Sequence, residues 1–96
     1  MTEKTLTFPT IHMNGTSAVY LKEALENAYS SIGDAQKALR QTTPNARDYY
    51  VQSDPEAYKK AADQHYARLQ ALENIRTELV DICNAIDSQI PPRRQP

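Results

Sequence analysis

The sequence predicts an all-α fold: an antiparallel two-helix hairpin with an extended N-terminal arm, assembling into a homo-oligomeric helical bundle. Three observations support this prediction. Apolar residues recur every three or four positions in two segments, capping residues and prolines bound both segments, and the second segment carries more apolar surface than one neighbouring helix would cover. With 96 residues, the chain has room for a single domain over 1–96.

Residues 1–15 lack a helical period, and Pro9 interrupts their apolar positions. We expect them to form an extended arm that packs on another surface, such as that of a neighbouring subunit. Ser17 follows a turn and is a residue type preferred at helix N-caps, so the first helix is expected over 17–42. It should end there because the residue before Pro44 disfavours the α conformation. Its apolar seam has heptad spacing: Leu21, Leu25, Ala28, Ile32, Ala35, Leu39 and Thr42.

A polar loop is expected over 43–54 and a second helix over 55–88, with a disordered tail over 89–96. Asp54 suits an N-cap before a proline at the first helical position, and Ser53 with Glu56 suits a capping box. Two heptad seams overlap on this helix, which indicates contact with more than one helix. The first seam is Ala61, His65, Arg68, Leu72, Ile75, Leu79, Ile82 and Ile86. The second is Tyr58, Ala62, His65, Leu69, Leu72, Arg76, Leu79, Cys83 and Ile86.

Composition excludes several classes of protein. Eleven Lys and Arg against twelve Asp and Glu give a net charge of −1, which argues against a nucleic-acid polymer as partner. No apolar run approaches the roughly 20 residues of a membrane span, and the N-terminus lacks a signal-peptide core. The single cysteine, Cys83, excludes an internal disulfide and fits a reducing cytoplasm. No metal-ligand spacing and no nucleophile with a placed base are found, so we expect neither an enzyme nor a cofactor or metal.

Three clusters are candidate ligand sites. The first lies before the first helix, where backbone amides and the positive end of the helix dipole suit a phosphate; ordinary capping is the alternative. Its residues are His12, Asn14, Gly15, Thr16 and Ser17.

The second cluster lies in the loop and joins an arginine, which suits phosphate, to two tyrosines, which suit stacking on a base. Its residues are Asn45, Arg47, Asp48, Tyr49 and Tyr50. The alternative is a loop held by an Arg47–Asp48 pair and by tyrosine packing.

The third cluster is His65, Tyr66 and Arg68, of which His65 lies on both seams of the second helix and Arg68 on the first. Burying a charge without a partner is costly, and either structural ion pairing or an anionic ligand would offset that cost. A tight hairpin would place Thr42 opposite Pro55 and Ser17 opposite Val80. The turn and loop clusters would then lie about 35 Å apart and would share a site only across subunits.

Residues 11–86 resemble a family of small phage and prophage helical-hairpin proteins in three runs: His12-x-Asn14-Gly15-Thr16, Pro44-Asn45-x-Arg47-Asp48-Tyr49-Tyr50 and His65-x-x-Arg68-Leu69. More loosely, the architecture resembles the hairpin domain of phage anti-CBASS and anti-Thoeris sponge proteins. This resemblance implies a homo-oligomer, with a hexamer or tetramer favoured, in the cytoplasm of an infected bacterial host. It implies sequestration, without cleavage, of a nucleotide immune signal of the cyclic oligonucleotide or cyclic ADP-ribose type.

Two alternatives remain open at the level of the sequence. One is a protein–protein interaction module, such as a phage adaptor or an inhibitor that captures a helix of a host protein. The other is a small structural phage protein.

Overall fold

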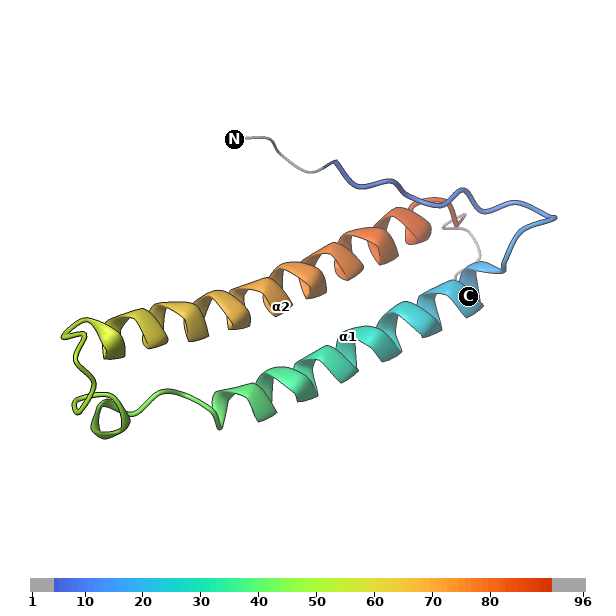
Figure 1. Cartoon of the computed structure of the whole chain (residues 1–96). Helices are drawn as coiled ribbons and strands as arrows, with labels where there is room; N and C mark the ends of the chain where they lie inside the picture. Colours follow the sequence, from blue (N-terminus) through green and yellow to red (C-terminus); the bar gives the residue numbers. More distant parts are fainter. Residues whose placement is uncertain (1–4, 91–96) are drawn as a thin grey trace.

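The computed structural model describes residues 5–90, which form two antiparallel helices joined by a loop and preceded by an extended arm (Figure 1). Helix α1 spans Ala18–Arg40, a short 3-10 helix η1 spans Ala46–Asp48, and helix α2 spans Ala57–Asp87. No strand occurs among residues 5–90. The predicted all-α hairpin is therefore confirmed. The disordered tail predicted over 89–96 is wrong for Gln89 and Ile90, whose backbone amides donate to the carbonyls of Ile86 and Asp87. Residues 91–96 of that tail and the first four residues of the arm lie outside the described residues.

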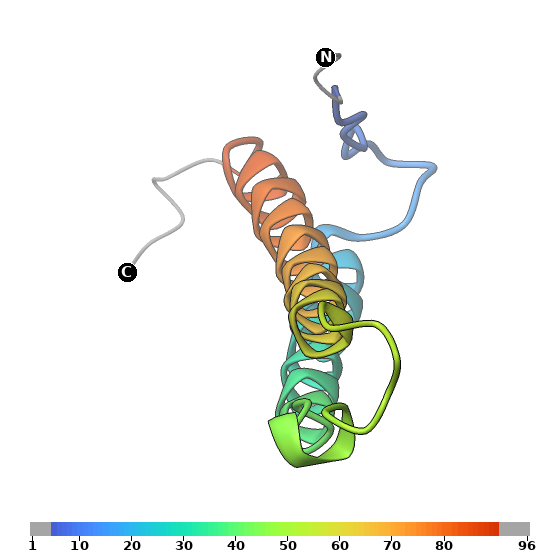
Figure 2. The same cartoon turned by 60° about the vertical axis from the view of Figure 1, so that its left-hand side comes forward.

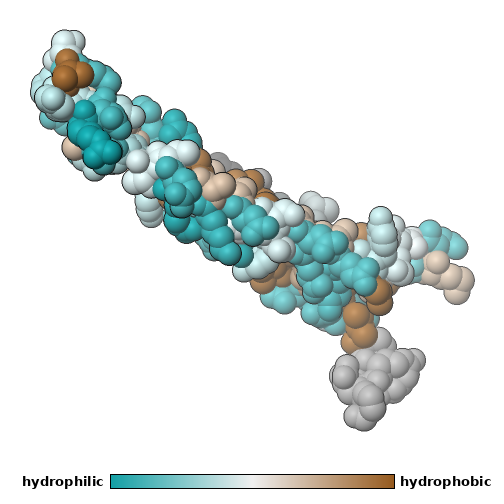
Figure 3. All heavy atoms as spheres, turned by 90° about the horizontal axis from the view of Figure 1, so that it is seen from below, coloured by the Kyte–Doolittle hydropathy of each residue, from teal (hydrophilic) through white to brown (hydrophobic). Residues whose placement is uncertain are grey.

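The molecule is a thin rod of 63 × 30 × 23 Å (Figures 1 and 2). Its radius of gyration is 19.7 Å, whereas a compact domain of this length has about 12.5 Å. Ile86 is the one fully buried apolar side chain of the described part of the chain. Seen from the side of α1, hydrophilic residues cover most of the surface and hydrophobic residues form separate patches (Figure 3). Two helices of this length therefore share a core only one side chain thick.

Local capping sets the ends of α1. The Ser17 side chain accepts a hydrogen bond from the Tyr20 backbone amide, as the N-cap prediction requires. At the other end, the Thr42 and Thr43 hydroxyls donate to the carbonyls of Leu39 and Arg40, and Pro44 follows. The helix ends two residues earlier than predicted because these hydroxyls bond the last carbonyls in place of a further turn.

Helix α2 begins at Ala57, two residues after the predicted start. The Asp54 side chain accepts from the Glu56 amide and pairs with Lys60 Nζ at 2.7 Å, so it closes a turn before the helix. Glu56 is the N-cap residue and makes no side-chain capping bond. Both predicted starts are therefore wrong: the N-cap is Glu56 and not Asp54 before a helical Pro55, and no capping box of Ser53 and Glu56 forms because Asp54 already holds the Glu56 amide.

Polar contacts at both ends of the hairpin fix the register of the two helices. Lys22 pairs with Asp87 near the arm, and Thr43 Oγ1 lies 3.1 Å from His65 Nε2 near the loop. The predicted register, with Thr42 opposite Pro55 and Ser17 opposite Val80, is wrong by about three helical turns. The loop does not reverse tightly; it lies under the first turns of α2, where the Tyr49 and Tyr58 ring centroids are 6.3 Å apart.

The predicted seams are confirmed in part. On α2, the members of the second seam are buried or half-buried except Tyr58, whereas Arg68 and Ile75 of the first seam are exposed. On α1, Leu21, Leu25, Ile32 and Leu39 are half-buried as predicted. The predicted inner positions Ala28, Ala35 and Thr42 are wrong, because all three are exposed and Gln36 is buried instead.

The N-terminal arm is bound to the end of α2. The Gln89 side-chain amide accepts from the Ile11 backbone amide at 2.8 Å and donates to the Pro9 carbonyl at 2.9 Å. Figure 1 shows the arm returning from the start of α1 alongside the C-terminal part of α2. Residues 9–11 of the predicted extended arm are thus bonded to the chain's own second helix end, whereas contact with a neighbouring subunit stays a prediction.

Candidate functional site

The turn before α1 is occupied by local bonds. Ser17 caps the helix, and the Gly15 amide donates to the His12 carbonyl at 3.1 Å. Gly15 does not have a positive φ, and a Cβ there would lie 2.8 Å from Nε2 of the exposed His12 side chain. Asn14 and Thr16 are exposed. The geometry agrees with the capping interpretation of this cluster.

The loop cluster is divided between structural and exposed side chains. Asn45 caps η1 by accepting from the Arg47 amide at 3.0 Å, and Tyr49 packs against Tyr58. Tyr50 is 78% exposed, and Arg47 and Asp48 are exposed without an ion pair between them. The alternative of an Arg47–Asp48 pair is therefore wrong, while the tyrosine packing is present. Arg47, Asp48 and Tyr50 are the exposed side chains of this cluster that neither cap nor pack on a neighbour.

His65 is a structural residue. It is 6% exposed, and its Nε2 lies 3.1 Å from Thr43 Oγ1. Since the Thr43 hydroxyl donates its proton to the Arg40 carbonyl at 2.6 Å, it accepts from His65, so the imidazole proton is on Nε2. The histidine thus links the end of α1 to α2. Tyr66 and Arg68 are exposed, so the predicted third cluster does not share one site.

The three clusters do not converge. The turn cluster lies at the arm end of the rod and the loop cluster at the opposite end, with His65 between the helices near the loop (Figure 1). Within one chain, the exposed residues of the turn cluster and those of the loop cluster therefore cannot contact one small ligand together.

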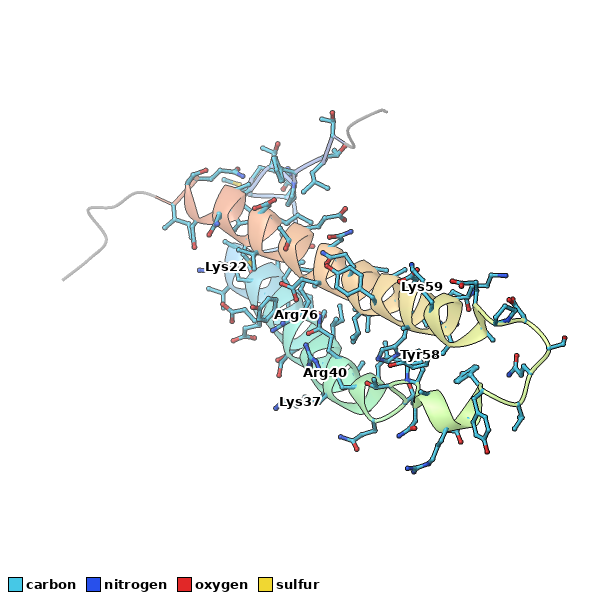
Figure 4. All side chains as sticks on the ribbon, turned by 90° about the vertical axis from the view of Figure 1, so that its left-hand side faces the viewer. Lys22, Lys37, Arg40, Tyr58, Lys59 and Arg76 are labelled. Carbon is cyan, nitrogen blue, oxygen red and sulfur yellow. The ribbon has the colours of Figure 1, made fainter. Side chains whose placement is uncertain are left out.

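Sequence reasoning missed a polar bridge between the middles of the two helices. Gln36 is 4% exposed; it donates to Glu73 Oε1 at 3.0 Å and accepts from Arg76 Nη1 at 3.0 Å. The Arg76 guanidinium carbon lies 3.9 Å from the Tyr29 ring centroid, and its Nη2 would be 3.3 Å from a Cβ at Gly33. Figure 4 shows Arg76 reaching from α2 toward α1. The signal available in the sequence was Arg76 itself, a charged residue on an apolar seam.

This bridge shifts the ionisation of Glu73. The hydrogen bond from Gln36 lowers the pKa of the Glu73 carboxyl, and the Arg76 charge lowers it further. Arg76 Nε is buried without a hydrogen-bond partner among the described residues. The bridge therefore contains one donor without a hydrogen bond, Arg76 Nε, beside the hydrogen bonds of Gln36 to Glu73 and Arg76.

A groove of about 280 Å³ runs between the helices toward the arm end. Its lining includes Lys22, Glu26, Tyr29, Val80, Cys83 and Asp87. Lys22 is already paired with Asp87, so the groove has an excess of acidic charge and is unsuited to a phosphate. Burial raises the pKa of the Cys83 thiol, which disfavours the reactive thiolate.

Charge is distributed unevenly along the rod. Residues 37–68, at the loop end, contain six Lys and Arg against four Asp and Glu. The remaining described residues, toward the arm end, contain two against seven. Within residues 5–90, Lys22, Lys59, Lys60 and Arg76 form ion pairs, whereas no ion pair is found for Lys37, Arg40, Arg47 and Arg68. Figure 4 shows Lys37 and Arg40 together near the C-terminal end of α1.

No family model matches this chain, and no curated protein and no solved structure is significantly similar to it. Neither described helix is long and apolar enough to cross a membrane. Within residues 5–90, no three His, Cys, Asp or Glu side chains are grouped to hold a metal ion.

Proposed function

We propose that the chain is a phage-type anti-defence sponge: a homo-oligomeric protein that binds a small nucleotide-type anion without cleaving it, at the loop end of the hairpin. The observation that carries the proposal is the charge distribution. The loop end has an excess of cations, four of them in no ion pair within residues 5–90, while the arm end is acidic. An anion approaching the rod is attracted to one end and repelled from the other.

Arg47 and Tyr50 carry the chemistry of this proposal. A guanidinium offers a planar fork of donors to a phosphate, and an exposed phenol ring offers a face on which a base can stack. Both side chains are exposed, three residues apart, on a loop anchored by the Asn45 cap and by the packing of Tyr49 on Tyr58. A site of this kind needs no catalytic group. The resemblance to sponge proteins makes cyclic oligonucleotides and ADP-ribose derivatives the ligands to test first.

Calorimetry of the full chain against cyclic dinucleotides, cyclic trinucleotides and ADP-ribose derivatives tests the proposal. We expect one of these classes to bind and to be recovered chemically unchanged by chromatography after the protein is denatured. Arg47→Ala should weaken binding by roughly 10-fold or more, as expected for a lost charge-assisted hydrogen bond worth about 1.5–3 kcal/mol. Tyr50→Ala should weaken it by at least about 5-fold, because base stacking contributes about 1–3 kcal/mol.

Lys59→Ala is the matched control. It removes one positive charge from the same end of the rod, but Lys59 is already paired with Asp63 at 2.8 Å. We expect this variant to bind like the unmodified chain. Absence of binding by every ligand, equal loss in all three variants, or recovery of a cleaved ligand would each refute the proposal.

A further inference from the structure

The groove at the arm end of the rod continues into a second hollow. Lys22 and Glu26 line both, so the groove of about 280 Å³ and the hollow of about 220 Å³ form one depression beside α1. Leu25, Leu79 and Val80 give the groove apolar walls, and Val80 is 40% exposed. Figure 4 shows Lys22, which lies between the two parts, at this end of the rod. The depression is therefore an open surface that joins apolar walls to charged side chains.

Carboxylates outnumber cations in this depression. Three carboxylates line it, and they belong to Glu23, Glu26 and Asp87. Asp87 is paired with Lys22, whereas Glu23 and Glu26 take part in no ion pair within residues 5–90. These two glutamates are three residues apart, so they are neighbours on the helix surface. The depression, here called the acidic groove, thus suits an occupant that has two cations and apolar groups.

The segment that follows the last described residue has this chemistry. Ile90 lines the second hollow together with Glu23 and Glu26, so the described part of the chain ends beside the acidic groove. The next six residues contain two cations, three prolines and no acidic residue: Pro91-Pro92-Arg93-Arg94-Gln95-Pro96. Arginine pairs with carboxylates through two parallel hydrogen bonds, and proline-rich segments bind apolar grooves. The segment therefore matches the acidic groove in charge and in apolar character.

The segment is also long enough to cover the acidic groove. At the polyproline rise of about 3.1 Å per residue, six residues span roughly 19 Å. The groove-lining part of α1, from Val19 to Tyr29, spans about 15 Å at 1.5 Å per residue. Because the segment is joined to the groove through Ile90, its effective concentration there is on the order of millimolar. This attachment favours it over a separate molecule of the same chemistry.

We propose that residues 91–96 of the same chain bind in the acidic groove, with Arg93 and Arg94 paired to Glu23 and Glu26 and the prolines against the apolar walls. In this arrangement the segment covers Cys83, which lines the groove and is half-buried between the helices. The acidic groove lies at the arm end, so the inference does not rest on nucleotide binding at the loop end.

Alkylation of Cys83, the single cysteine of the chain, by a neutral reagent measures how well the groove is covered. Arg93→Gln combined with Arg94→Gln should raise the alkylation rate at least about threefold, because it removes the two ion pairs that hold the segment. The direction separates coverage from charge alone. In an uncovered groove, loss of two nearby cations would raise the pKa of the thiol and slow the reaction.

Lys37→Gln combined with Arg68→Gln is the matched control. It removes the same charge from exposed positions toward the loop end and should leave the alkylation rate unchanged. Helical circular dichroism of all variants shows that the rates are compared between folded chains. An unchanged or lower rate in the Arg93 and Arg94 variant, or an equal rise in the control, overturns the proposal.

Carbodiimide coupling tests the contact directly. Arg93→Lys combined with Arg94→Lys keeps both charges and supplies amines that the reagent joins to carboxylates in contact with them. We expect peptide mass mapping to find an amide between the segment and Glu23 or Glu26 within one chain. In the same background, Glu23→Gln combined with Glu26→Gln should abolish this product. Absence of the amide, coupling of the segment to carboxylates along the whole rod, or coupling to a second copy of the chain overturns the proposal.

Discussion

The Gln36 bridge should be a major source of stability in a hairpin with so small an apolar core. Gln36→Ala removes two hydrogen bonds to charged partners, each worth about 1.5–3 kcal/mol where both partners stay dry. Water replaces the bond at Glu73, whose side chain is 51% exposed, but less readily at Arg76, whose side chain is 21% exposed and already has an unpaired Nε. We therefore expect a loss of about 2 kcal/mol in the free energy of unfolding.

Thermal unfolding followed by helical circular dichroism at fixed protein concentration measures this loss. For a chain of this size, about 2 kcal/mol corresponds to a fall of roughly 8–16 °C in Tm. Gln64→Ala is the matched control, since Gln64 is an exposed glutamine on α2 and should change stability by less than about 0.5 kcal/mol. If Gln36→Ala costs no more than Gln64→Ala, the bridge does not stabilise the hairpin and the reasoning fails.

The pH dependence of stability distinguishes loss of the hydrogen bond to Glu73 from the general effect of shortening the Gln36 side chain. The hydrogen bond from Gln36 is the largest cause of the lowered pKa of Glu73. A carboxyl with a lowered folded-state pKa contributes stability that is complete above its unfolded value of 4.5 and is lost as the pH falls through the folded value. Gln36→Ala should therefore lose less stability than the unmodified chain when the pH falls from neutral to below 4.5. Equal losses of stability in the two proteins would show that the lowered pKa of Glu73 does not depend on Gln36.

Two further substitutions test the packing and the capping. Ile86→Ala should lower the free energy of unfolding by about 2–5 kcal/mol, because Ile86 has no exposed surface, and chemical denaturation should show a partly unfolded chain before denaturant is added. Ser17→Ala should cost about 1 kcal/mol by removing the bond to the Tyr20 amide, whereas Thr16→Ala, which removes an exposed hydroxyl beside it, should be nearly neutral in the same assay.

The sequence predicted those parts of the fold that depend on local interactions. The ends of α1 and α2 lie within two residues of their predicted positions, because Ser17, Pro44 and Asp54 act on backbone groups two or three residues away. The register of α2 against α1 could not be predicted from local interactions. It depends on the path of the loop under α2, and heptad periodicity is compatible with several offsets of one helix against the other. The burial of Gln36 was missed for the same reason, since its partners are on the other helix.

The candidate site residues also fall into those that bond to nearby backbone groups and those that the fold leaves exposed. Ser17 and Asn45 each fit a capping and a ligand interpretation in the sequence, and in the structure their side-chain oxygens accept from nearby amides. Arg47 and Tyr50 are left to solvent by the fold, and no local pattern distinguishes them from Asn45 in the same loop.

The two buried polar residues explain why one register is selected. Apolar seams that repeat every seven residues allow α2 to slide by a heptad against α1 with similar apolar contacts. His65 and Gln36 remove that freedom, because their partners Thr43, Glu73 and Arg76 are present at one offset only. A slip by seven residues one way would place Val80 near Gln36 and leave the amide and the imidazole without these partners, at about 1–3 kcal/mol for each group; the opposite slip would bring His65 near Gln36 but would remove both charged partners of Gln36. In a rod with one fully buried apolar side chain among its described residues, polar pairing therefore specifies the register that apolar packing leaves ambiguous.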